Sequence, residues 1–255
     1  MSHALVLGAS RGLGAATAQR LAADGIHVHL LARDLDRLTA LVTGIRESGG
    51  HADAHAVDAT EPEGFDAQLA ALADRYPIRR LLINSGGPRP AGFDQLTDTD
   101  WHDAGQGTLM VAVRALRAVR PGMVSAGFGR IVVVGSSSVR QPIDGLLLSN
   151  VYRAGVLALV KSLTPELMAA GVTINMLSPG RIDTDRVRSL DAARAARTGG
   201  DPTDVRAESI RRIPAGRYGT PAEFADAAAF LLSDTASYLT GQSILVDGGL
   251  VTALP

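Results

Sequence analysis

The sequence has 255 residues, of which 46% are hydrophobic and only 4% aromatic, and its formal net charge is −1. A nearly neutral chain predicts no general attraction to nucleic acid or to a membrane surface, and no apolar run reaches the length that spans a bilayer. The chain contains no cysteine, which excludes disulfides, a thiolate nucleophile and a cysteine-based zinc site. Its first residues lack the pattern of a signal peptide, so we expect a cytoplasmic globular protein.

Short runs of branched and aliphatic residues alternate with longer amphipathic segments. The strand-like runs are, in chain order, ALVLGAS, HVHLLAR, HADAHAVDA, RLLINSGG, GRIVVVGSSS, VTINMLSPG and QSILVDGG. The helical segments lie at 12–24, 34–48, 63–75, 99–125, 149–170 and 221–233. This alternation predicts one α/β domain over residues 1–255, a Rossmann-type doubly wound, seven-stranded parallel sheet with helices on both faces.

One region departs from this alternation. Residues 181–220 are rich in Arg, Asp, Gly and Pro, as in ARTGGDPTD, and we expect an irregular excursion there. Ligands of open α/β sheets bind beyond the carboxyl ends of the strands, so the excursion is predicted to be a substrate lid. Five charged residues either line the mouth of a site or meet solvent, and the sequence leaves this open; they are Arg140, Asp144, Arg188, Arg194 and Arg197.

A glycine-rich turn, GASRGLG, joins the first strand to the first helix. Glycine permits a tight turn and lets backbone N–H groups approach a phosphate, while the helix N-terminus adds a partial positive charge. The pattern predicts a pyrophosphate site, with an ordinary turn as the alternative. The residues expected to form it are Gly8, Ser10, Arg11, Gly12, Leu13 and Gly14.

Three further stretches follow strands: HAVDAT, INSGG and NMLSPGRIDT. With the glycine turn, they make the sequence similar to the short-chain dehydrogenase/reductase superfamily over nearly its whole length. The segment RYGTPAEFADAAAFLLSDTASYLTGQSILVDGG resembles the 3-oxoacyl-acyl-carrier-protein reductase branch. The resemblance implies a nicotinamide cofactor held, beyond the glycine turn, by Asp58, Ala59, Asn84, Ser85, Gly86, Arg153, Pro179, Gly180, Ile182 and Thr184.

The end of the second strand indicates which nicotinamide cofactor binds. Arg33 stands where an acidic residue would bind the ribose of NAD, and an arginine there can pair with a 2′-phosphate. Arg11 is a second candidate for the same phosphate. These residues favour NADP(H) over NAD(H). The alternative is that both arginines are solvated and Asp34 holds a ribose.

The resemblance also locates the family's catalytic Asn, Ser, Tyr and Lys. The strand GRIVVVGS implies that Ser136 is the serine, and the Tyr-x-x-x-Lys frame then falls on Ser149 and Arg153. Counting from Trp101, the asparagine position falls on Thr108. Only the serine is retained. Serine is a far weaker acid than tyrosine, and an arginine stays charged and cannot relay a proton.

Tyr152 is the remaining candidate for a displaced acid. It lies three residues after Ser149, about one helical turn along the same face, from where its hydroxyl would have to bend back toward Ser136. The alternative is a tyrosine buried in the core or in an interface. His29, His51, His55 and His102 show no metal-ligand spacing, so we expect solvated histidines and no metal site.

We therefore predict an NADP(H)-dependent oxidoreductase acting on a small molecule: a carbonyl, an enone or a quinone-like ring, of acyl or polyketide type by resemblance. The alternatives are a non-redox enzyme on the same scaffold, such as a dehydratase, cyclase or isomerase, and a catalytically silent nucleotide-binding subunit. The resemblance implies a homotetramer or homodimer formed through the two long helices and the C-terminal segment. No residue indicates an acyl carrier protein, nucleic acid or a membrane as partner.

Overall fold

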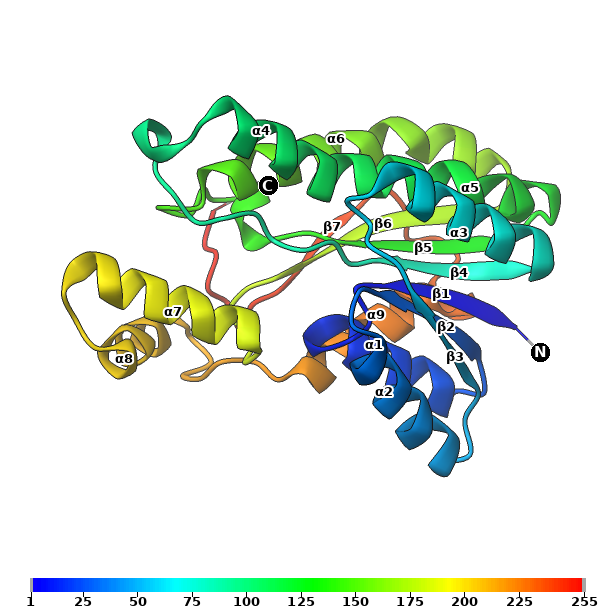
Figure 1. The fold of residues 1–255 in the computed structure, drawn as a ribbon, viewed down its shortest axis with the longest axis horizontal. Coiled ribbons are helices and arrows are strands. Elements are labelled where there is room, and N and C mark those ends of the chain that lie inside the picture. Colours follow the sequence, from blue (N-terminus) through cyan, green and yellow to red (C-terminus); the bar gives the residue numbers. More distant parts are fainter. Residues whose placement is uncertain (1, 254–255) are drawn as a thin grey trace.

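Seven strands form one sheet, and every neighbouring pair in it is parallel (Figure 1). The structure is a computed structural model that describes residues 2–253. The strands are β1 (His3–Leu7), β2 (His27–Ala32), β3 (Ala52–Ala56), β4 (Ile78–Ile83), β5 (Gly129–Val134), β6 (Val172–Pro179) and β7 (Ser243–Val246). Their order is β3-β2-β1-β4-β5-β6-β7. It reverses direction between β1 and β4, where open α/β sheets bind their ligands. The predicted fold is confirmed.

Helices cover both faces of the sheet (Figure 1). The helices are α1 (Gly12–Ala23), α2 (Leu35–Glu47), α3 (Pro62–Arg75), α4 (Asp98–Gly105), α5 (Val111–Ser125), α6 (Leu147–Ala169), α7 (Asp185–Thr198), α8 (Pro202–Arg212) and α9 (Pro221–Leu232). One core packs α3, α5 and α6 against the sheet, and a second packs α1, α2 and α9 against its other face. Central strands are therefore buried on both sides, and every residue of β5 is buried.

The segment expected to form one helix over 99–125 is interrupted. A π-helical turn, Gln106–Met110, separates α4 from α5. Glycines at 105 and 107 weaken the regular helix here, and Tyr152 of α6 packs against Gly105. The turn contains Thr108, which is buried and lines the cleft described below. π-Turns of this kind occur frequently at functional sites.

The excursion at 181–220 is not irregular, which corrects the sequence-based expectation. It contains α7 and α8, which lie together to one side of the carboxyl ends of the strands (Figure 1). Thr184 caps α7 by accepting from the Val187 N–H, and Asp201 caps α8 by accepting from the Thr203 N–H. The many charged residues hid two short helices, since these helices bury few residues each. None of the helices described within 2–253 could span a membrane.

The expectation of solvated histidines is wrong for His29. Its side chain has no exposed surface, because it lies in the middle of β2 under the ring of Tyr76, with the ring centroids 4.2 Å apart. His55 is half-buried beside it, whereas His51 and His102 are exposed as expected. Sequence spacing did not reveal this cluster because its members come from three different strands.

Candidate active site

A cleft of about 1930 Å³ opens above the carboxyl ends of the strands. It exceeds the 300–1,000 Å³ that is common for a small-ligand site, so it has room for a dinucleotide and a substrate together. All the residues predicted to hold the cofactor line this cleft except Gly14, and the catalytic positions Thr108, Ser136, Ser149 and Arg153 line it too. Tyr152 does not belong to its lining. The other predicted cofactor and catalytic residues are therefore brought together around one cleft.

The glycine turn is shaped by contacts that leave no room for a side chain. Gly8 has a positive φ of 62°, and a Cβ there would lie 2.3 Å from the Asn84 carbonyl oxygen. A Cβ on Gly14 would lie 2.3 Å from the Gly8 carbonyl oxygen. Gly14 therefore permits the close packing of the turn, although it does not line the cleft. The Asn84 side chain donates to the Gly8 carbonyl oxygen at 3.1 Å and fastens the turn to the end of β4.

The N-terminus of α1 faces this turn without a capping side chain. Arg11 stands at the N-cap and makes no side-chain cap hydrogen bond, and the first turn contains no acidic residue. The first N–H groups of a helix have no partner within the helix, and together with the helix dipole they favour a bound anion. The geometry therefore fits the pyrophosphate of a dinucleotide.

Arginines gather where the adenosine end of such a dinucleotide would lie. Arg11, Arg33 and Arg37 all line the cleft beside Asp58, and Arg33 lies 3.6 Å from the Asp58 carboxylate. Partial burial opposes ionisation of Asp58, but hydrogen bonds from Thr60 and the charge of Arg33 prevail and lower its pKa. Sequence reasoning missed Arg37, although it stands four residues after Arg33 near the start of α2.

Asp34 is engaged in a structural role. It is the N-cap of α2, where its side chain accepts from the Arg37 N–H at 3.1 Å, and its carboxylate lies 3.1 Å from the Arg37 guanidinium. A capping carboxylate already paired with a cation is poorly suited to bind a ribose. This arrangement favours the phosphate-binding interpretation of the neighbouring arginines.

The catalytic positions meet where β5 ends and α6 begins. Ser136 follows β5, and its Oγ accepts from the Ser138 N–H at 3.1 Å. With one lone pair so engaged, the Ser136 hydroxyl proton is free to be donated. Ser149 lies in the first turn of α6, and Arg153 follows one turn later on the same face.

Arg153 is almost fully buried, with 6% of its surface exposed. Its guanidinium donates to the carbonyl oxygens of Val134, Ser85 and Gly86, so it joins the end of β5 to the turn after β4. Within residues 2–253, no carboxylate lies within 4.0 Å of this guanidinium, so Arg153 forms no ion pair there. Burial, and secondarily the charge of Arg186, lowers its pKa to about 10, which leaves it charged at neutral pH. These hydrogen bonds come from its two Nη atoms.

Tyr152 turns away from this group, so the structure does not support it as a displaced acid. Its hydroxyl donates to the Trp101 carbonyl oxygen at 2.7 Å, and its ring contacts the Trp101 ring with centroids 6.1 Å apart. Adjacent helical positions point about 100° apart, so the Tyr152 side chain points toward α4 while the Arg153 side chain points into the cleft. The interpretation as a packing tyrosine fits this geometry.

α7 contacts the opposite side of the cleft. Arg186 donates to the Pro88 carbonyl oxygen at 2.7 Å, and Arg197 lies 3.1 Å from Asp144. Asp144 and Arg194 line the cleft, whereas Arg140 and Arg188 do not. The sequence analysis did not include Arg186, although its position two residues after Thr184 could have indicated it.

Comparison with known proteins agrees with this geometry. Residues 8–251 match the family described as Enoyl-(Acyl carrier protein) reductase. The chain is 35% identical over 253 residues to a putative ketoacyl reductase of the monensin polyketide synthase from Streptomyces virginiae, covering 97% of this chain and 96% of that protein.

A 3-oxoacyl-[acyl-carrier-protein] reductase from Vibrio cholerae is 33% identical over 248 residues, covering 97% of this chain and 96% of that protein. Among solved structures, an actinorhodin polyketide ketoreductase with NADPH superposes with a TM-score of 0.93 at 30% identity, covering 98% of this chain and 97% of that chain. That cofactor supports the predicted preference for NADP(H). The chain therefore belongs to the short-chain dehydrogenase/reductase family of oxidoreductases, in the branch of the 3-oxoacyl-acyl-carrier-protein reductases.

Proposed function

We propose that this oxidoreductase uses NADP(H) to reduce a conjugated carbonyl, an enone or a quinone-like ring, and that Ser136 and Arg153 stabilise the oxyanion that forms. The observation that carries this proposal is the buried, charged guanidinium of Arg153. It faces the cleft without a carboxylate partner among residues 2–253. The resemblance implies that Arg153 stands at the family's lysine position and Ser149 at its tyrosine position.

The bound cofactor would supply the hydride. The glycine turn would hold its pyrophosphate, and Arg11 and Arg33 would bind its 2′-phosphate. The chain's own residues must then manage the negative charge that hydride transfer creates. A preorganised cation and a hydroxyl donor in a buried site are well suited to this task, because they need no reorganisation as the charge develops.

Without a proton donor as acidic as tyrosine, the site favours one kind of carbonyl substrate over another. Hydride addition to a simple ketone leaves a strongly basic alkoxide, which needs a proton donor at once. Ser149 is too weak an acid, and the Tyr152 hydroxyl is committed to Trp101. In an enone, hydride from the bound cofactor would form a bond to the β-carbon. The C=C electron pair would then become the double bond between the α-carbon and the carbonyl carbon, and the C=O pair would move onto oxygen, giving a less basic enolate. Water would protonate the α-carbon and leave as hydroxide, and Arg153 would keep its own proton throughout.

A second guanidinium favours a substrate that carries negative charge. Arg186 lines the same cleft close enough that its charge lowers the pKa of Arg153. It has no carboxylate partner within 4.0 Å in the part of the chain that the structure describes. Two neighbouring positive charges repel one another until an anion binds between them. A conjugated carbonyl bearing a carboxylate would relieve this repulsion.

A second candidate is reduction of an acyl or polyketide-type ketone, with water supplying the proton. It is supported by the relatives, whose names are those of ketoacyl and 3-oxoacyl reductases. The two candidates share the cofactor and differ in the acceptor, so a substrate panel separates them.

The test follows NADPH oxidation with neutral enones, carboxylated enones, quinones and a 3-oxoacyl thioester. We expect turnover of the conjugated acceptors, fastest with the carboxylated ones. Arg153→Ala should lower kcat by about 100-fold or more, the loss typical of one oxyanion donor. Arg153→Lys should recover part of it, and His102→Gln is the matched control on the exposed face of α4.

Three other outcomes would overturn the proposal. Turnover of the 3-oxoacyl thioester alone would establish the second candidate. Tight NADPH binding with no oxidation of any acceptor would indicate non-redox chemistry or a silent subunit. Full activity of Arg153→Ala would remove the guanidinium from the reaction.

We also propose that the chain forms a homo-oligomer through α5, α6 and the C-terminal segment. Large apolar side chains are exposed on these elements: Val124 on α5, Val151 on α6, and Phe230 and Tyr238 toward the C-terminus. Such residues are common at subunit interfaces. Light scattering on the purified chain would give a dimer or tetramer mass, and a monomer mass would contradict the proposal.

A further inference from the structure

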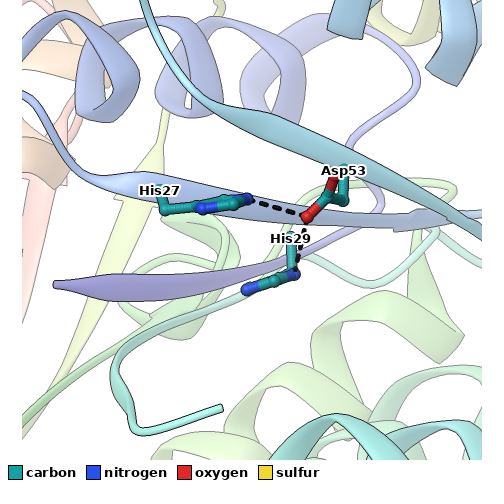
Figure 2. A group of neighbouring side chains, drawn as sticks. All are labelled: His27, His29 and Asp53. Carbon is teal, nitrogen blue, oxygen red and sulfur yellow. Dashed lines mark hydrogen bonds and ion pairs between the residues drawn. The ribbon is translucent and has the colours of Figure 1, made fainter. Parts of the chain in front are cut away.

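A group of imidazoles lies on the sheet away from the cleft. His3 begins β1, His27 and His29 share one side of β2, and Asp53 and His55 share the same side of β3. The strand register places His29 opposite Asp53 and His27 opposite His3. Because alternate residues of a strand face the same side, these side chains converge on the face covered by α3. Figure 2 shows His27 and His29 directed toward the same Asp53 carboxylate.

The donor atoms have the spacing of a metal-binding group. His27 Nε2 lies 2.8 Å from Asp53 Oδ2, and His29 Nδ1 lies 3.9 Å from the same oxygen. One donor atom from each of the three residues lies within 4.8 Å of the others. Tetrahedral zinc with bonds of about 2.0–2.2 Å holds its ligand atoms roughly 3.3 Å apart. Small movements of these side chains would meet that geometry.

His29 Nδ1 makes a long hydrogen bond to His55 Nε2 at 3.4 Å, and Asp53 Oδ2 lies 3.9 Å from it. Both distances exceed the 2.7–3.2 Å of a strong hydrogen bond. A buried polar atom without a good partner is unfavourable. A metal ion bound between these atoms would satisfy it, and His55 would then be near enough to supply a fourth ligand.

The surrounding groups complete the arrangement. His29 Nε2 lies 3.0 Å from His3 Nδ1, and Arg46 donates to Asp53 Oδ1 at 3.1 Å. Metal-binding histidines commonly donate their second ring N–H to such a partner, which fixes the tautomer that leaves the first nitrogen free.

We propose that His27, His29 and Asp53 bind a divalent transition-metal ion of the Zn²⁺, Co²⁺ or Ni²⁺ type, with His55 as an additional ligand. Imidazole donors suit these ions, whereas Mg²⁺ and Ca²⁺ prefer all-oxygen sites. The ion would join β2 to β3, the strand at the edge of the sheet. Its role would be to stabilise this edge. The site is independent of the proposed redox function, since none of its ligands lines the cleft.

The experiment uses the full chain without a histidine tag, stripped with chelator. Titration with Co²⁺ alone should give one equivalent of bound ion with the visible absorption bands of a tetrahedral site. Zn²⁺ should displace it. At saturating Zn²⁺, Tm should rise by roughly 5 °C, because an ion that binds only the folded state stabilises it.

Two variants test the assignment without replacing the fully buried His29. His27→Gln and Asp53→Asn should each weaken Co²⁺ binding by at least 10-fold, while His102→Gln should leave it unchanged. The proposal is overturned if the natural chain shows no saturable Co²⁺ bands. It is also overturned if a folded His27→Gln protein binds Co²⁺ as tightly as the natural chain. Circular dichroism establishes the folded state of each variant.

Discussion

The resemblance implies that the two halves of the cleft depart from the family to very different degrees. In the nucleotide half, Gly8 and Gly14 leave no room for a side chain, and the Asn84 side chain holds the turn through its hydrogen bond to Gly8. In the catalytic half, three of the four positions implied by the resemblance hold other residues: Thr108, Ser149 and Arg153. Phosphate binding depends on backbone N–H groups and close packing, so it admits few alternatives. Charge stabilisation depends on side chains, and a different side chain can perform different chemistry on the same frame.

The strongest way to break this comparison is to damage the nucleotide half. Gly14→Ala would place a Cβ 2.3 Å from the Gly8 carbonyl oxygen, which would displace the phosphate-binding turn. We expect NADPH affinity to fall by about 100-fold, the effect of an overpacking strain of 2–3 kcal/mol. Fluorescence titration with NADPH measures it.

Gly44→Ala is the matched control, because a Cβ at this position of α2 meets nothing within 4 Å. It should leave NADPH affinity unchanged and raise stability by up to about 1 kcal/mol through helix propensity. An unchanged NADPH Kd in Gly14→Ala would show that the turn is not the phosphate site.

The next prediction sharpens cofactor choice within the nucleotide half. Arg33→Ala should weaken NADPH binding by about 10- to 100-fold, the loss of one charged hydrogen bond of 1.5–3 kcal/mol, and should leave NADH binding nearly unchanged. Arg11→Ala should act in the same direction. Titration of each variant with both nucleotides gives the ratio of Kd values.

Arg20→Ala is the control for that measurement, since Arg20 lies on the exposed face of α1 and pairs with Asp24 and Asp226. Equal losses for NADPH and NADH in Arg33→Ala would contradict a 2′-phosphate contact. They would point instead to a general effect on the fold of β2.

Much of the site was predictable because its signals are local. The glycine turn, Ser136 and the frame of Ser149 and Arg153 are each defined within a few residues of a strand or helix end. The contact of Arg186 with Pro88 joins residues 98 positions apart, so no local pattern in either segment predicts it. His29 and Asp53 each follow the two-residue period of their own strand, yet only the register of β2 against β3 brings them together. The sequence also hid α7 and α8, whose charged surfaces lack a clear apolar stripe.

The pH profile tests the catalytic half. Burial and the charge of Arg186 lower the pKa of Arg153 to about 10, and the charged form is the one that stabilises an oxyanion. We therefore expect kcat/KM to stay flat between about pH 6 and 9 and to fall about tenfold per pH unit above the Arg153 pKa. The sign follows from the required form, because deprotonation as pH rises removes the positive charge.

Arg186→Gln sharpens this prediction, since it removes one cause of the lowered pKa of Arg153. The alkaline limb of the profile should move to higher pH in this variant. A limb near neutral pH that does not move would assign the titration to another group, and Arg153 would not control the rate.

The smallest expected effect concerns Tyr152, the residue that separates the two interpretations of α6. Tyr152→Phe removes the hydroxyl that donates to the Trp101 carbonyl oxygen at 2.7 Å, so unfolding in urea should show a loss of about 1 kcal/mol. The hydroxyl does not face the cleft, and kcat should therefore stay within about twofold of the natural value. A loss of kcat by 100-fold with unchanged stability would make Tyr152 the acid after all. That result would mean that the Tyr152 side chain turns into the cleft during turnover. The proton donor would then come from a different position of α6, and the site would still contain a tyrosine acid.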